Sequence, residues 1–239
     1  DTTSLKSKAK RKVITQNVCL ALIDVAREKG DFDMIKAYWN TYHCQQTLIC
    51  TNDRLHGVYC RNSFCTICAG IRKAEIINHY LPVLMTWDDA YFVTLTARSV
   101  TAPKLRSRFQ RMIKSLNKIL ARNKKRFQRG KAIQFMGIRS LECNFNPIAR
   151  TYNPHFHIIV SSREAAEIII KEWLEQCTPK FALRQCQYMR KVKDQVHDLI
   201  EVVKYGSKIF TDPTMNKKDK SKIPPKIYVA AFHNIIKSM

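Results

Sequence analysis

The sequence predicts an α+β protein in which helices pack on a central antiparallel sheet. Residues 91–96 read Tyr-Phe-Val-Thr-Leu-Thr, an aromatic and β-branched run that is typical of a central strand. Residues 132–145 and 155–161 also have strand composition, and the loop between them contains Asn146-Pro147, so they predict a hairpin. Residues 103–125 carry apolar side chains at helical spacing with Arg and Lys on the remaining face, which predicts an amphipathic helix.

The other segments complete this architecture. Residues 1–42 predict a basic, helical N-terminal arm, and residues 43–85 predict a Cys-rich element followed by a helix that ends near Pro82. Helices are expected at 164–177 and 192–207, with a strand near 181–189. We therefore expect three parts: the arm (1–42), a small zinc-binding element with its helix (43–85) and a catalytic domain (86–239).

Composition favours a polyanionic partner. The 239 residues contain 42 Lys and Arg against 19 Asp and Glu, a formal net charge of +23. Nucleic acid is the leading candidate. A membrane surface is less favoured, because the basic residues are spread along the chain and no apolar run approaches the roughly 18 residues of a spanning helix. No signal peptide is recognised at Asp1. Cysteines clustered in one segment fit a reducing cytoplasm better than a secreted disulfide framework.

Two histidines alternate with apolar residues in the predicted strand 155–161. His155 and His157 therefore share one face, while Phe156 and Ile158 point to the other. Neutral imidazoles are common metal ligands, although backbone carbonyls can also satisfy them. Glu142, on the strand expected to pair with 155–161, is the acidic residue best placed as a third ligand. This donor set suits Mn²⁺ or Mg²⁺ better than structural zinc, although it also occurs in catalytic zinc sites.

A second group of reactive side chains lies near the end of the predicted helix 192–207. Glu201, Tyr205 and Lys208 are spaced by four and three residues, so they share a face if the segment is helical. A tyrosine phenolate can attack phosphorus and remain attached to the DNA. An unperturbed phenol has a pKa of about 10, so a nearby cation such as Lys208 or a divalent metal would be needed to favour the phenolate. The alternative to a reactive site is that these three side chains form an ordinary solvent-exposed face of a helix.

Five of the nine cysteines fall between residues 44 and 68, which indicates a local metal site. Zinc prefers four thiolate or imidazole ligands. The favoured ligand set is Cys50, Cys60, Cys65 and Cys68, and Cys44 could take the place of Cys50. The alternative is that no metal binds and these cysteines are reduced, buried thiols. Zinc here would shape a small knuckle that turns three basic residues toward DNA: Arg61, Arg72 and Lys73.

The densest basic run lies in residues 106–129. Phosphate contacts from such a run would make DNA binding strongly salt-dependent, whereas the alternative is a solubilising helix face. The candidate contacts are Arg106, Arg108, Arg111 and Lys114.

Four ordered elements resemble those of a known family. Thr94-Leu95-Thr96, His155-Phe156-His157 and Glu201-x3-Tyr205-x2-Lys208 are similar in order and spacing to the three motifs of plasmid rolling-circle replication initiators of the HUH endonuclease superfamily, single-tyrosine branch. Cys60-x4-Cys65-x2-Cys68, with Arg72 after it, resembles the Cys-rich N-terminal element of one branch. The resemblance spans roughly residues 44–236. Ser63 and Thr66 depart from it, since the family usually has Arg and Pro there, and the chain stops at Met239, about where further sheet is expected.

The resemblance implies an HUH, ferredoxin-like nuclease fold and a division of roles. Tyr205 would cleave one strand at a replication origin and hold its 5′ phosphate, Glu142 would join His155 and His157 on Mn²⁺ or Mg²⁺, and Glu201 would activate water for the terminating cut. The partners implied are origin DNA with a single-stranded nick site and a host helicase and polymerase. Two alternatives stay open: an HUH transposase or mobilisation relaxase, and a non-catalytic zinc-containing DNA-binding protein. The sequence leaves the origin sequence and the oligomeric state unknown.

Overall fold

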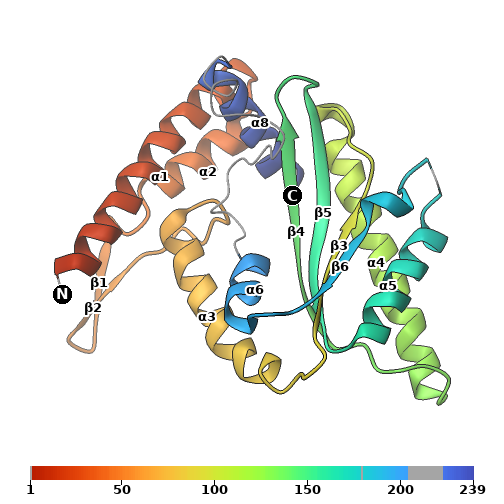
Figure 1. Ribbon diagram of the computed structural model, residues 1–239. Coiled ribbons are helices and arrows are strands. Elements are labelled where there is room, and N and C mark those ends of the chain that lie inside the picture. Colours follow the sequence, from red (N-terminus) through yellow and green to blue (C-terminus); the bar gives the residue numbers. More distant parts are fainter. Residues whose placement is uncertain (1, 179, 204–222) are drawn as a thin grey trace. The chain divides into compact units, whose positions relative to one another are not determined.

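The computed structural model describes residues 2–178, 180–203 and 223–239 (Figure 1). The chain divides into two compact units, Asp1–Ala74 with Gly206–Lys237 and Glu75–Tyr205 with Ser238–Met239. Helix α3 (Thr66–Leu84) contributes to both units. The boundaries expected after residues 42 and 85 do not coincide with this division, since the units separate within α3.

Helices dominate the first unit. α1 (Thr2–Glu28), α2 (Phe32–Tyr42) and α8 (Pro225–Ser238) contribute to one apolar core that includes Leu22, Tyr38 and Phe232. The single helical arm expected at the N-terminus is two helices, because Gly30 adopts φ 64° and ends the first of them. In the described part of the chain, none of the helices combines the length and apolar composition that crossing a membrane requires.

The Cys-rich segment of this unit holds a hairpin that the sequence analysis did not predict. β1 (Leu48–Thr51) pairs antiparallel with β2 (Arg54–Gly57), and Asn52 and Asp53 form the turn with positive φ, a conformation that Asn and Asp tolerate. The following α3 continues to Leu84, close to the end expected near Pro82. Pro82 lies inside the last turn of this helix, two residues before its end.

A four-stranded antiparallel sheet forms the centre of the second unit, with strand order β4-β5-β3-β6. The strands are β3 (Tyr91–Thr96), β4 (Gly137–Asn146), β5 (Thr151–Val160) and β6 (Tyr188–Lys191). The predicted hairpin is confirmed, and its register places Glu142 opposite His155. The α+β class with an antiparallel sheet is also confirmed.

Helices cover both faces of this sheet (Figure 1). α4 (Leu105–Gln128) and α5 (Arg163–Gln176) share a core with Val93, Phe156 and Ile158 on one face. The opposite face packs Phe92 and Ile159 against α6 (Gln195–Val202) and the C-terminal part of α3. Since strand residues alternate between faces, the two histidines of β5 lie on the α6 side of the sheet.

The strand expected near 181–189 is later and shorter than predicted. A 3₁₀ turn (Arg184–Cys186) precedes β6, and Gln187 replaces a backbone partner there: its side-chain oxygen accepts from Thr96 N at 2.8 Å and its amide donates to Leu183 O at 2.7 Å. Backbone pairing of β6 with β3 therefore reaches only from Tyr188 to Lys191. Phe181 is a core residue before the turn.

Candidate functional site

The strongest candidate site is a group of three side chains on the α6 face of the sheet. The Nε2 atoms of His155 and His157 lie 3.8 Å and 3.7 Å from Oε2 of Glu142. His155 is 6% exposed, and all three donor atoms lie within 4.8 Å of one another. Two ligands on one cation at about 2.1 Å can be at most about 4.2 Å apart, so both nitrogen–oxygen distances fit a shared metal ion. Two imidazoles and one carboxylate are a donor set that can hold a divalent metal ion.

Hydrogen bonds orient both imidazoles toward this point. Nδ1 of His155 lies 3.0 Å from the carbonyl oxygen of Asn153, and Nδ1 of His157 lies 3.3 Å from Oγ1 of Thr94. With Nδ1 donating in each ring, both Nε2 lone pairs face Glu142, the tautomer a metal requires. From the sequence alone, Thr94 is most simply a β-branched strand residue. Its place opposite His157 in the register of β3 and β5 is the signal that identifies this role.

Glu201 lies on α6, on the same side of the sheet. It reaches Arg190 of β6 (nitrogen–oxygen distance 3.8 Å), whose guanidinium lies 4.8 Å from the ring centre of Phe92. The Phe92 ring in turn lies 5.2 Å from that of His157. A continuous set of contacts therefore connects Glu201 to the histidine pair. Tyr205 and Lys208 lie outside the described residues.

Arg190 also anchors α6 through Asp198, which is 2% exposed. Nη1 of Arg190 donates to Oδ2 of Asp198 at 2.8 Å, and Nη2 contacts the other carboxylate oxygen. His197, Asp198 and Glu201 also form a group of possible metal ligands, but the Asp198 carboxylate is already occupied by this two-point ion pair. Arg190 and Asp198 carry no local sequence signal of this role, because their partnership depends on how α6 packs.

This ion pair makes stability depend on pH. The Arg190 guanidinium holds the pKa of Asp198 below its usual range, so the pair stabilises the folded state above about pH 4 and loses its effect as pH falls through the folded pKa. We expect Asp198→Asn to lower the free energy of unfolding at pH 7 by about 2–3 kcal/mol. In urea titrations the difference from the parent should shrink below about pH 4. Exposed Glu175→Gln is the control, and an unchanging difference from pH 7 to pH 3 would contradict the assignment.

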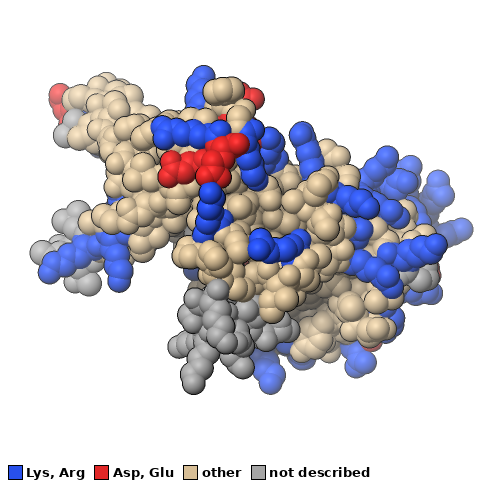
Figure 2. All heavy atoms as spheres, turned by 90° about the horizontal axis from the view of Figure 1, so that it is seen from above, with Lys and Arg blue, Asp and Glu red and all other residues tan. Residues whose placement is uncertain are grey.

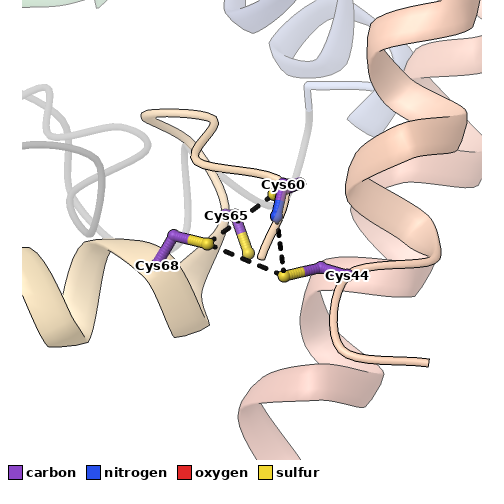
Figure 3. Close-up of side chains that lie close together, drawn as sticks. All are labelled: Cys44, Cys60, Cys65 and Cys68. Atoms are coloured by element: carbon purple, nitrogen blue, oxygen red, sulfur yellow. Dashed lines mark hydrogen bonds between the residues drawn. The ribbon is translucent and has the colours of Figure 1, made fainter. Parts of the chain in front are cut away.

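A second candidate metal site lies in the first unit, where four cysteine side chains point toward one another (Figure 3). Sγ of Cys68 lies 3.6 Å from Sγ of Cys44 and 3.7 Å from Sγ of Cys60, and Cys65 completes the group. A tetrahedron of thiolates at a zinc–sulfur distance of about 2.3 Å has edges of about 3.8 Å, whereas a disulfide needs about 2.05 Å. All four thiols are free. The spacing therefore fits zinc coordination and not a disulfide.

Hydrogen bonding already favours a thiolate in this cysteine cluster. The Cys65 thiol donates to Cys60 and lowers the pKa of Cys60 to about 5, while burial raises the pKa of Cys44 to about 11. The backbone N–H of Cys60 also donates to Sγ of Cys44 at 3.5 Å. Thiolate is the form of cysteine that binds metals.

The ligand expected at Cys50 is corrected by the structure, which places Cys44 there instead. Cys50 is exposed on β1, whereas Cys44 is 2% exposed within the cluster. The hairpin explains the difference, because Gln45 N donates to Val58 O at 2.8 Å and Val58 N to Thr47 O at 2.9 Å. Because of this pairing at the base of the hairpin, the chain that leaves the hairpin lies beside Cys44. Cys50 lies further along β1, away from the base.

The candidate DNA contacts on α4 lie on the sheet face opposite the histidines. Arg106 and Lys114 are exposed, but Arg108 and Arg111 lie 4.4 Å and 4.1 Å from the ring centre of Phe181. Further along α4, Arg122 and Arg126 pair with the buried Glu172. Part of the basic run is thus structural. Figure 2 shows Lys and Arg gathered on its right, where Figure 1 draws α4 and α5.

The three basic residues beside the cysteine cluster differ in their surroundings. Arg61 is exposed and adopts φ 59°, whereas Arg72 and Lys73 are half-buried on α3. Nη2 of Arg72 donates to the carbonyl oxygen of Asn62 at 3.3 Å. Arg72 therefore ties α3 to the loop that carries Cys60 and Cys65.

Together, the antiparallel sheet with its His-x-His pair and carboxylate, and the four-cysteine cluster, define an α+β protein with two candidate metal centres, as the motif resemblance implies. The model of a family described as "Replication protein" matches residues 53–223, more than half of the sequence. The chain belongs to this replication protein family, which confirms its recognition as a plasmid replication initiator.

Individual relatives agree with this assignment. "Protein rep" of Staphylococcus aureus is 28% identical over 66% of this chain and 72% of its own length. "Protein rep" of a Bacillus species is 26% identical over 44% of this chain, and "Protein rep" of Bacillus amyloliquefaciens is 26% identical over 43%. The match spans about a third of the length of each Bacillus protein, 34% and 30%. No solved structure gives a significant match.

Proposed function

We propose that this protein nicks and rejoins one DNA strand to start rolling-circle replication of a plasmid, in the cytoplasm. The observation that carries the proposal is the convergence of Glu142, His155 and His157, with both Nε2 atoms turned toward one carboxylate oxygen. Family membership favours a replication origin as the target over a transposon end or a transfer origin.

In the first step, the phenolic oxygen of Tyr205 attacks phosphorus and the bond from phosphorus to the 3′ oxygen breaks. The phenol loses one proton and the departing 3′ oxygen gains one, so a 5′-phosphotyrosine and a free 3′ hydroxyl result. The ammonium of Lys208, three residues after Tyr205 in the sequence, would favour the phenolate by its charge. The 3′ hydroxyl then primes synthesis by a host polymerase, with a host helicase separating the strands.

Glu142, His155 and His157 would hold the Mn²⁺ or Mg²⁺, which when bound polarises the scissile phosphate and offsets its developing charge. The protein's own contribution is orientation. The Nδ1 atoms of His155 and His157 hydrogen-bond to Asn153 O and Thr94 Oγ1, and these bonds fix the orientation of the two rings. The metal-binding atoms therefore converge before any substrate binds.

Glu201 would act later, as the general base that activates water for the terminating cut. We expect Glu201→Ala to spare the first cut and to slow release of the covalent complex about a hundredfold, because a general base contributes at least that much. Glu142→Ala should instead weaken metal binding and slow the first cut. Single-turnover nicking and adduct decay, followed separately on denaturing gels, measure the two steps. Equal loss of the first cut in both variants would contradict this division.

The cysteine cluster would hold a structural zinc through Cys44, Cys60, Cys65 and Cys68. We expect Cys44→Ser to lose the bound zinc and to lower the melting temperature, because structural zinc contributes folding free energy directly. Cys50→Ser is the matched control and should keep about one equivalent of zinc. Colorimetric zinc release with thermal melting measures both effects, and zinc retained in Cys44→Ser but lost in Cys50→Ser would restore the original ligand set.

DNA contacts would be divided between two surfaces. Arg61, Arg72 and Lys73 beside the cysteine cluster, and the exposed Arg106 and Lys114 of α4, would bind phosphates of the origin. Because α4 lies on the face of the sheet opposite the histidine pair, it would contact a part of the DNA away from the phosphate being cleaved.

The test of the proposed function is a covalent adduct between protein and DNA. Single-stranded or supercoiled origin DNA, incubated with the protein and Mn²⁺, should yield a protein-linked 5′ end that survives denaturing electrophoresis. EDTA should prevent the adduct and added Mn²⁺ should restore it. Salt-sensitive DNA binding without any adduct would instead support the non-catalytic zinc-containing DNA-binding protein.

A further inference from the structure

A second site lies on the sheet face away from the histidine pair. A cavity of about 400 Å³ opens between α4, the start of β4 and β5, within the range of small-molecule sites, about 300–1,000 Å³. Its apolar lining comes mainly from Leu116, Leu120, Phe127, Phe135, Ile158 and Val160. Phe127 is 42% exposed, so the cavity presents an aromatic ring that solvent and a ligand can reach.

One polar group in this cavity is not explained by the fold. Asn123 of α4 is only 2% exposed and lines the cavity, and its Nδ2 has no hydrogen-bond partner. Buried amides are almost always paired, because an unpaired one loses the hydrogen bonds that water would supply. An apolar residue of similar volume would avoid that cost. The amide therefore points to a ligand that brings a hydrogen-bond acceptor.

The remaining polar lining indicates the chemistry of that ligand. The amides of Gln128 and Gln134 add donors and acceptors, and the exposed side chains of Lys124 and Arg139 bring positive charge. An aliphatic ligand would leave Nδ2 of Asn123 without a hydrogen-bond partner. A nucleotide of a DNA strand supplies a flat base for the phenylalanines, an acceptor edge for Asn123 and a backbone phosphate for Lys124 or Arg139.

We propose that this cavity holds an unstacked base of single-stranded DNA. The base is not the one at the scissile phosphate, since Ile158 and Val160 line the cavity while His155 and His157 face the other side of the same strand. The proposal goes beyond the nicking reaction, because it requires neither the metal group nor Tyr205.

The test uses the full chain without added Mn²⁺ or Mg²⁺ and a short fluorescent single-stranded oligonucleotide, with the same oligonucleotide carrying abasic positions as the reference. We expect Phe127→Ala and Asn123→Leu to weaken binding of the normal oligonucleotide about tenfold, within the range for removing one stacked or paired base contact. Binding of the abasic oligonucleotide should be unchanged by either substitution. Lys124→Gln should weaken binding more than Lys171→Gln, an exposed lysine of α5 outside the cavity lining.

Thermal melting separates this role from a structural one. Asn123→Leu should melt no lower than the parent, because it removes an unpaired buried amide. A lower melting temperature with unchanged affinity would overturn the proposal, as would equal effects of the substitutions on normal and abasic DNA. Free dAMP binding as tightly as the oligonucleotide would overturn the assignment to a DNA strand. Adduct formation, measured in parallel, should persist in Asn123→Leu, so failure of the base site and failure of the nicking proposal are distinguishable.

Discussion

Replacing Tyr205 by Phe is expected to abolish the covalent protein–DNA adduct and to slow nicking at least about a thousandfold. Phenylalanine keeps the aromatic ring but lacks the oxygen that would bond to phosphorus. Binding to the oligonucleotide should change little, since one phenolic oxygen contributes little to phosphate and base contacts. Denaturing gels of end-labelled DNA measure the adduct, and anisotropy measures binding.

Tyr188 provides the matched control for this substitution. It lies on β6 and is 57% exposed, so Tyr188→Phe makes the same chemical change at an exposed position of the second unit. It should form the adduct at the parental rate. An adduct that persists in Tyr205→Phe would assign the nucleophile to another residue, even if the metal requirement holds.

Replacing His157 by Ala is expected to slow nicking about a hundredfold or more and to weaken Mn²⁺ binding by a similar factor. The substitution removes one of the two imidazole nitrogens that face Glu142. Titration calorimetry with Mn²⁺ alone measures the affinity without DNA, and single-turnover nicking at saturating metal measures the rate. Excess Mn²⁺ should recover part of the activity.

His79→Ala is the control, because His79 is an exposed residue of α3 in the same unit. It should leave both metal affinity and nicking unchanged. Equal Mn²⁺ affinity in the parent and His157→Ala would show that the three side chains are a structural group, and the proposed role of the metal would fail with it.

Thr94 shows how far strand pattern alone can lead. Alternation in 155–161 correctly predicted one face for His155 and His157, and the hairpin correctly placed Glu142 beside them. The contact of Thr94 with His157 required the pairing of β3 with β5. That pairing joins residues about sixty positions apart, and local propensity carries no information about which strands become neighbours.

The cysteines illustrate the same limit in another form. Their clustering in the sequence indicated a metal site, but spacing could not choose between Cys44 and Cys50. The choice depends on the β1–β2 hairpin, which brings Cys44 beside Cys60 and leaves Cys50 exposed. A short hairpin of this kind has a weak local signal, since four-residue strands offer little periodicity.

The sequence by itself determined the α+β class, the basic character of the chain, the histidine pair with its carboxylate and the order of the family motifs. These depend on side-chain alternation, charge and residue spacing, which are local properties of the chain. Only the tertiary structure decided the fourth cysteine, the Arg190–Asp198 anchor of α6, the separation of α4 from the histidine face and the cavity at Asn123. Each of these depends on the packing of distant segments, where burial and pairing across the fold outweigh local preference.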